Sequence, residues 1–150
     1  MAKEIERKFL VSNDSFRTLA SEQIEISQGY LSSDPDRTVR VRLWNESGYL
    51  TVKTRNIGAV RDEWEYEIPA ADARAMLKAC SSVLSKTRWI VTGSDGMRWE
   101  VDEFHGKLDG LIIAEIELPA EDTPFLLPGF AGKEVTGDAG YYNSNLAAQV

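Results

Sequence analysis

The chain has 150 residues, enough for one domain with a single modest core, and we expect that domain to span residues 1–150. The net charge of −7 argues against nucleic acid or an anionic membrane as the main partner, because both need a cationic footprint. Cys80 is the only cysteine, so no intrachain disulfide can form and a cytoplasmic location is expected. No apolar run approaches the roughly 18 residues of a membrane helix, and residues 1–9 lack the apolar stretch of a secretory signal.

Period-two alternation of apolar and polar residues predicts most of the structure. It indicates strands over residues 5–11, 24–32, 37–45, 49–55, 61–69, 85–93, 97–104 and 111–119. Capping residues predict a short helix over 12–23, helical spacing predicts another over 70–84, and the tail predicts a third over 141–149. The segment 120–131 is mixed, with at most one helical turn. We therefore expect an α+β protein, mainly antiparallel β, with about eight strands that can close into a barrel.

Like charges recur two residues apart on one predicted strand after another. Side chains two apart share a face of a strand, so these strands have one charged and one apolar face. A half-exposed sheet would also look like this. A solvated face usually mixes the signs of its charges, however, whereas here acidic and basic pairs occupy different strands. The pairs are Glu4 and Glu6, Arg40 and Arg42, Lys53 and Arg55, Glu65 and Glu67, Lys86 and Arg88, Glu100 and Asp102, and Glu115 and Glu117.

A closed sheet with its charged faces inward would gather these pairs in one lumen. A barrel of roughly eight strands is wide enough to hold one small ligand. Carboxylates are suitable ligands for Mg²⁺ or Mn²⁺, and Arg and Lys bind phosphoryl oxygens. Phosphoryl transfer combines these groups, because the metal and the cations neutralise charge on the phosphoryl oxygens. The pattern therefore predicts a metal-dependent site for a polyphosphorylated small molecule, without choosing the substrate.

The stretch EIERK at residues 4–8 is the first of an ordered set of motifs. The others are QGYL (28–31), VRVRL (39–43), TVK (51–53), EWEYEI (63–68), KTR (86–88), WEVDEF (99–104), AEIEL (114–118), EVT (134–136) and YYNSNLA (141–147). The set resembles the CYTH superfamily, the triphosphate tunnel metalloenzymes, and is most similar to their short bacterial single-domain members. The resemblance implies an eight-stranded closed β-barrel, or tunnel, with a charged lumen and a few flanking helices. It also implies Mg²⁺- or Mn²⁺-dependent chemistry on a triphosphate.

The resemblance also implies roles for individual residues. The metal ligands would be Glu4, Glu6, Glu115 and Glu117, with Glu100 and Asp102 near a second metal. The triphosphate would be held by Lys8, Arg40, Arg42, Lys53, Lys86 and Arg88. The catalytic residues would be Lys8, which would orient or activate the water, and Glu65 and Glu67, which would position that water or serve a second metal. Relatives often carry a basic residue before the tyrosine of a C-terminal D-x-R-Y motif. Gly140 occupies that place here, and Arg7, Arg61 and Lys133 are the candidates to compensate.

The function expected from these residues is hydrolysis of inorganic triphosphate, with phosphate as a product. Three alternatives remain open: an adenylate cyclase or a thiamine triphosphatase of the same superfamily, and a polyphosphate-binding module without turnover. The expected partner is a small-molecule triphosphate, and the chain could also pair as a homodimer. Trp44 shares the parity of Arg40 and Arg42. We expect it at a strand end, with stacking on a substrate base as the alternative.

Overall fold

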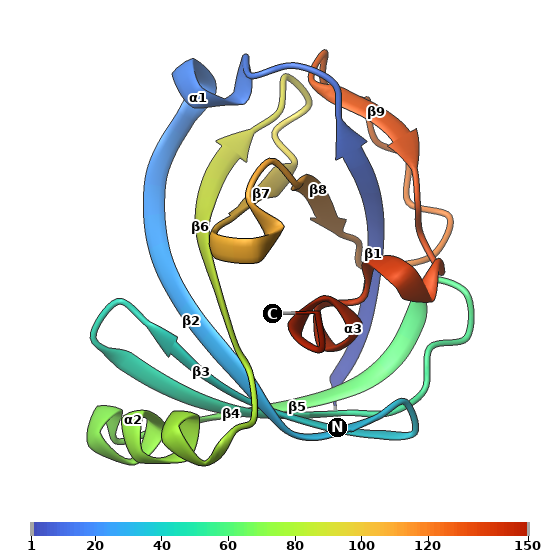
Figure 1. The fold of residues 1–150 in the computed structure, drawn as a ribbon. Helices are drawn as coiled ribbons and strands as arrows, with labels where there is room; N and C mark the ends of the chain where they lie inside the picture. The colour runs from blue at the N-terminus through green and yellow to red at the C-terminus, as the bar shows by residue number, and fades with distance from the viewer. Residues whose placement is uncertain (1, 150) are drawn as a thin grey trace.

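The computed structural model describes residues 2–149, which form a β-barrel with three short helices on or in it (Figure 1). The strands are β1 (Ala2–Val11), β2 (Ala20–Asp34), β3 (Arg37–Trp44), β4 (Ser47–Lys53), β5 (Val60–Ile68), β6 (Val83–Thr92), β7 (Arg98–Phe104), β8 (Ile112–Glu117) and β9 (Ala131–Glu134). The helices are α1 (Phe16–Leu19), α2 (Ala70–Ala79) and α3 (Asn143–Ala147), with 3-10 turns at Gly106–Leu108 and Ala139–Tyr141. Within residues 2–149, no helix is long and apolar enough to cross a membrane.

Eight of the strands close into the barrel. They follow the order β5-β4-β3-β2-β6-β7-β8-β1, and β1 pairs with β5 to complete the circle, with Glu4 opposite Arg61. Every pairing is antiparallel. The remaining strand, β9, pairs with the far end of β1 outside this circle. The expected closed eight-stranded antiparallel barrel is therefore confirmed.

Three local predictions were wrong, and pairing within the sheet explains two of them. The helix predicted over 12–23 is observed only as α1, at Phe16–Leu19. The chain continues as strand β2 from Ala20, and β2 pairs with β6 over most of its length. The predicted helix over 70–84 ends at Ala79, because Val83 already pairs with Gly29 of β2. The short strand β9 was not predicted at all. Its four residues, AGKE, are too few to show an alternation.

A large apolar core covers the outside of the barrel at β1, β6, β7 and β8. Its centre is Trp99, which is fully buried and contacts Phe9 at a ring separation of 5.6 Å. Phe130, just before β9, packs on Trp99 at 6.4 Å. Fully burying one such aromatic ring stabilises the fold by roughly 1.5–3 kcal/mol. Because these apolar residues alternate with the charged ones, their outward packing turns the charged side chains into the lumen.

A second apolar cluster anchors α3, which lies across the opening of the barrel in Figure 1. Leu146 and Ala147 of α3 pack on Leu84, Phe104 and Ile113, which come from β6, β7 and β8. These three strand residues share the parity of the lumen side chains Lys86, Asp102 and Glu115. The helix is therefore held to the inside of the barrel wall, and the residues before it are brought to the lumen.

Candidate active site

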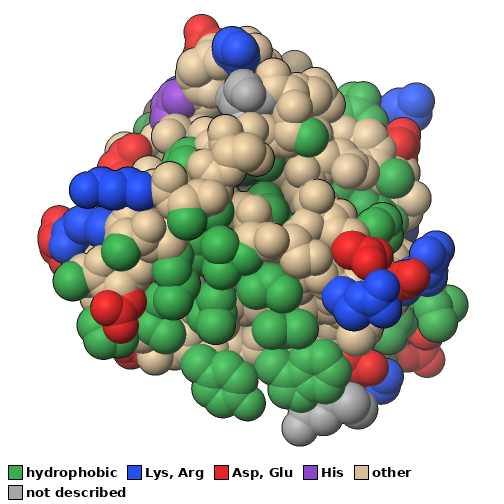
Figure 2. Space-filling view, turned by 60° about the horizontal axis from the view of Figure 1, so that its bottom comes forward, with side chains coloured by type: hydrophobic (Ala, Val, Ile, Leu, Met, Phe, Trp, Pro, Cys, Tyr) green, Lys and Arg blue, Asp and Glu red, His purple; other side chains and the backbone are tan. Residues whose placement is uncertain are grey.

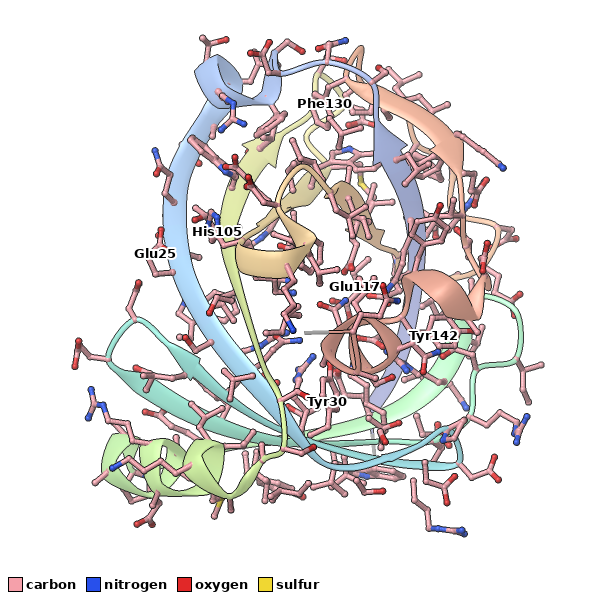
Figure 3. All side chains as sticks on the ribbon, viewed as in Figure 1. Glu25, Tyr30, His105, Glu117, Phe130 and Tyr142 are labelled. Carbon is pink, nitrogen blue, oxygen red and sulfur yellow. The ribbon has the colours of Figure 1, made fainter. Side chains whose placement is uncertain are left out.

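The lumen contains a cavity of about 730 Å³ that is lined by side chains from all eight barrel strands. Figure 3 shows side chains directed into this space, among them Glu117, Tyr30 and Tyr142. The charged lining residues are Lys3, Glu4, Glu6, Lys8, Arg40, Arg42, Lys53, Arg61, Glu63, Glu65, Lys86, Arg88, Arg98, Glu100, Glu115 and Glu117. Most of the sequence-predicted site residues therefore come together in one cavity.

One part of the lining carries cations that lack full compensation. Arg42 is buried, and its side chain donates one hydrogen bond within residues 2–149, from Nε to Oε1 of Gln28 at 3.0 Å. Burial, together with Arg40 and Arg88, lowers the pKa of Arg42 to about 9. Arg40 donates to Thr51 at 3.1 Å and to Glu65 at 3.3 Å, but within the described chain its buried Nε has no partner. Buried donors without partners are costly, and an anion in the cavity would satisfy them.

The opposite charge gathers where β1 and β8 run side by side. Lys8 Nζ lies 3.4 Å from Glu115 Oε1 and 3.7 Å from Glu6 Oε1, so one ammonium is shared between two carboxylates. Burial, Glu115 and Glu4 raise the pKa of Glu6 to about 7. Burial and neighbouring carboxylates also raise the pKa of Glu117. The repulsion among these acids is therefore only partly compensated by protein cations.

Glu4 is in a different position, because two cations neutralise it. Lys53 Nζ donates to both carboxylate oxygens at 3.0 Å, and Arg61 Nε donates to Oε1 at 2.8 Å. Burial alone would raise the pKa of Glu4, but Lys53 and Arg61 outweigh it and hold that pKa well below its usual range. Lys53 also pairs with Glu63 at 3.1 Å.

Asp102 lies behind the cations, and the residues that line the cavity do not include it. Its Oδ2 accepts from Lys86 Nζ at 2.6 Å, and Arg88 donates to both of its oxygens at 2.8 and 2.9 Å. Burial would raise the pKa of Asp102, but Arg88 and Lys86 hold it far below its ordinary value. Its predicted partner Glu100 does line the cavity and accepts from Arg88 Nη1 at 3.2 Å. The pair Glu100 and Asp102 is thus divided between two environments.

Two more predicted pairs are divided in the same way. Glu65 lines the cavity and accepts from Thr51 Oγ1 at 2.7 Å, whereas Glu67 is not among the lining residues. Lys53 lines the cavity, whereas Arg55 is exposed and pairs with Asp36. Glu67 lies near the end of β5 and Arg55 lies two residues after the end of β4, so the outer member of each pair is beyond the lumen.

Glu63 lines the lumen although it belongs to none of the predicted charged pairs, and Arg61, expected only as a substitute cation, lines it too. Both share the parity of Glu65 on β5, so extending that pair by four residues toward the N-terminus would have found them. Asn143, at the start of α3, also lines the cavity and accepts from Lys86 Nζ at 2.9 Å. No alternation in the sequence could reveal that contact, because it depends on the docking of α3.

Of the three cations suggested to compensate for Gly140, only one faces the lumen. Arg61 is mostly buried beside Glu4 in the cavity. Arg7 pairs outside the barrel with Glu134 at 2.6 Å, and Lys133 is exposed on β9. Gly140 itself is exposed in the turn before α3, where its N–H donates to Asp138.

The lumen carboxylates suit a hard divalent cation by their chemistry. Within residues 2–149, no three Asp, Glu, His or Cys side chains are already gathered as a metal site. Glu6, Glu115 and Glu117 nevertheless offer oxygen donors in one cavity, and the pKa values of Glu6 and Glu117 are raised by burial and by unrelieved repulsion from neighbouring carboxylates. A divalent cation would relieve that repulsion, so these residues fit Mg²⁺ or Mn²⁺.

The sequence pattern of the CYTH domain matches residues 2–148. The chain belongs to the CYTH domain family. This CYTH protein is 49% identical over 148 residues to an inorganic triphosphatase of Acetivibrio thermocellus, a match that covers 97% of this chain and 94% of the relative. It is 33% identical over 151 residues to an inorganic triphosphatase of Nitrosomonas europaea, and that match covers 98% of each chain.

Solved structures agree with this assignment. The crystal structure of an inorganic triphosphatase matches this CYTH protein with a TM-score of 0.70 and 31% identity, over 98% of this chain and 99% of the other. A more distant structure, of a putative adenylyl cyclase from Hippeastrum described as having a dominant triphosphatase activity, matches with a TM-score of 0.63 and 15% identity, over 78% of this chain and 80% of the other. The second likeness concerns the fold alone.

Proposed function

We propose that this CYTH protein is a metal-dependent hydrolase of inorganic triphosphate. The observation that carries the proposal is the division of charge inside one closed lumen. Undercompensated cations on β3 share a cavity with undercompensated carboxylates on β1 and β8. A polyanion accompanied by a divalent cation would satisfy both groups at once. The two inorganic triphosphatases related over nearly the whole chain support the same reaction.

Lumen cations are the proposed holders of the substrate. Arg40 and Arg42 offer free N–H donors, and guanidinium groups bind phosphoryl oxygens in pairs of hydrogen bonds. Lys86 and Arg88 add charge from β6, which β2 separates from β3, and their shared partner Asp102 fixes their positions. Because these four side chains are buried, their charges act in a low-dielectric environment where they are stronger than in water.

Metal binding is proposed for the acidic part of the lumen. CYTH triphosphatases are metal-dependent in general. Glu6, Glu115 and Glu117 would hold Mg²⁺ or Mn²⁺, and Glu4 would join them if Lys53 or Arg61 gave way. The metal would supply neutralisation of the charge that builds on the phosphoryl oxygens. Asp102 is not included in this proposal, because Lys86 and Arg88 occupy both of its oxygens.

Two residues are proposed to act on the attacking water. Lys8 lies between Glu6 and Glu115, where its ammonium can donate to a phosphoryl oxygen or orient a water beside the acids. Glu65 lines the cavity next to Arg40 and could accept a proton from a water at the substrate. Glu67 does not line the cavity, which argues against the same role for it.

Side-by-side assays of phosphate release would test this function. Inorganic tripolyphosphate, ATP and thiamine triphosphate would each be incubated with Mg²⁺, Mn²⁺ or EDTA, and the nucleotide products separated by chromatography. We expect release from tripolyphosphate that EDTA abolishes. Formation of cyclic AMP, or preferred hydrolysis of thiamine triphosphate, would replace the proposal with one of the related activities. Tight binding of tripolyphosphate without turnover would make the protein a binding module.

We also propose that the protein acts in the cytoplasm as a homodimer. The single cysteine supports the location.

The outer face of β3, β4 and β5 supports the dimer. Val39, Val52 and Trp64 form one row across this face, and Leu50 and Tyr66 form part of the next row. Tyr66 is 65% exposed, and Figure 2 shows hydrophobic side chains gathered on this face. Large exposed apolar patches are uncommon on monomers. Sedimentation should give a dimer that Tyr66→Lys dissociates; a monomeric wild-type protein would refute the pairing.

A further inference from the structure

Trp44 is the last residue of β3 and borders the lumen cavity. Its side chain shares the parity of Arg40 and Arg42 and packs against an apolar cluster of Ile24, Ile26 and Ile90. These three isoleucines are buried, and Ile26 lies directly opposite Trp44 across the β2–β3 pairing. The indole is therefore held in place on one side by apolar packing, while it contacts the charged part of the lumen on another.

Two guanidinium groups lie over the ring of Trp44. The Cζ atom of Arg42 is 5.8 Å from the ring centroid, and the Cζ atom of Arg88 is 5.7 Å from it. Arg88 is also fixed by Asp102, but Arg42 has only its Nε bond to Gln28 within the described residues. Both side chains are buried, so water does little to screen the repulsion between the two charges. An indole face stabilises a desolvated cation, and here one indole serves two.

We propose that Trp44 is a positioning residue, which holds Arg42 and Arg88 beside each other so that one polyphosphate can contact both. The identity of that anion rests on the proposed function. Trp44 need not touch the substrate, because it acts through the two arginines. If it only sealed the lumen, any apolar side chain of similar size would serve equally well. The proposal instead requires an aromatic face at this position.

Binding of inorganic tripolyphosphate in EDTA tests the proposal without catalysis or metal. Titration calorimetry would compare the wild-type protein with Trp44→Phe, Trp44→Leu and Trp89→Leu. Trp89 is the matched control, because it carries a cation–π contact with Arg17 at 5.3 Å on the outside of the barrel. We expect Trp44→Leu to weaken binding roughly tenfold, from the loss of two partly desolvated cation–π contacts, and Trp44→Phe to weaken it at most about threefold. Trp89→Leu should leave the affinity unchanged. In the hydrolysis assay, Trp44→Leu should raise KM and leave kcat within about twofold of the wild type.

Equal affinity of the wild-type protein and Trp44→Leu would overturn the proposal, and so would equal weakening by Trp44→Phe and Trp44→Leu. If Trp44→Leu does not fold, NMR of the wild-type side chains decides instead. The Nε–H signals of Arg42 and Arg88 should be shifted upfield by the indole ring and should move downfield in Trp44→Phe; unshifted signals would overturn the proposal. If the wild-type protein does not bind tripolyphosphate, the proposed function fails, while the NMR comparison still tests the positioning.

Discussion

Asp102 and Arg88 form a bidentate ion pair in the wall of the lumen. Arg88 donates from Nε to Oδ1 at 2.8 Å and from Nη2 to Oδ2 at 2.9 Å, and Lys86 Nζ reaches the same Oδ2 at 2.6 Å. The side chains of Asp102 and Lys86 are completely buried. One carboxylate thus fixes two of the cations proposed to hold the substrate, and it does so from behind the cavity surface.

Replacing Asp102 should separate this role from metal binding. Asp102→Asn leaves Lys86 buried without a counter-ion and Arg88 with Glu100 alone, so the free energy of unfolding should fall by about 3–5 kcal/mol. Urea unfolding would measure the loss. The folded Asp102→Asn variant should bind Mn²⁺ with the same affinity as the wild-type protein, whereas Glu117→Gln should bind Mn²⁺ more weakly. If the Asp102→Asn variant is stable but binds Mn²⁺ much more weakly than the wild-type protein, Asp102 is a metal ligand.

Glu4 and Glu6 should respond differently to the same substitution. Glu4→Gln breaks two buried ion pairs, with Lys53 and Arg61, and should lower the free energy of unfolding by about 3 kcal/mol. Glu6→Gln should change it by less than about 1 kcal/mol, because the raised pKa of Glu6 means that its neutral form is already populated near pH 7. Both variants should lose turnover. Thermal unfolding together with initial rates would test this, and equal destabilisation by the two changes would contradict it.

Glu65 and Glu67 provide a matched pair on β5. Glu65→Gln should lower kcat, because Glu65 lines the cavity and contacts Thr51 and Arg40. Glu67→Gln should keep both kcat and stability near wild type, within about 0.5 kcal/mol for an exposed substitution. Steady-state kinetics on the two variants would measure the difference. A large loss of kcat in Glu67→Gln would show that the rim of the barrel takes part in catalysis.

The affinity for tripolyphosphate should depend on the protonation of Lys86. Burial, Arg88 and Arg42 together lower its pKa from 10.5 to about 7, despite the opposing effect of Asp102. The native state therefore releases this proton at lower pH than the unfolded chain does. The contribution of Lys86 to the free energy of unfolding is therefore smallest below pH 7. It rises as the pH increases from 7 to 10.5.

Anion binding has the opposite dependence on pH, because it needs the ammonium form of Lys86. Affinity should fall above pH 7, by up to about tenfold per pH unit for one linked proton. Calorimetry from pH 6 to 9 would measure the affinity for tripolyphosphate. Repeating the titrations in buffers with different ionisation enthalpies would give the number of protons taken up on binding. Lys86→Met should bind weakly at every pH and take up no proton on binding. Proton uptake in Lys86→Met equal to that of the wild-type protein would assign the dependence to another group.

Much of the site could be predicted because a barrel strand has a strict period of two. Once Glu4 and Glu6 shared a face, the same parity applied along every strand that carried a charged pair. The alternation could not say where each strand leaves the lumen, so Glu67 was included and Glu63 was omitted. Parity also does not distinguish the surface of the cavity from the layer behind it. Asp102 points inward like Glu100, yet two cations enclose it.

Tertiary contacts explain the rest of what the sequence did not reveal. The residues Ser12, Asn13 and Asp14 indicated a helix, but pairing of β2 with β6 takes over from Ala20. Strand β9 forms because Phe9 and Val11 of β1 offer it an edge, and no pattern within AGKE shows this. Contacts between segments distant in sequence override local propensity in these places.

The most direct test of the account is ³¹P NMR of tripolyphosphate incubated with the purified protein and Mg²⁺. We predict that the tripolyphosphate signals disappear and that orthophosphate and pyrophosphate appear in equal amounts. EDTA should stop the reaction, and Glu6→Gln should slow it severely while the protein stays folded. Unchanged tripolyphosphate in the presence of folded wild-type protein and Mg²⁺ or another divalent metal would contradict the account.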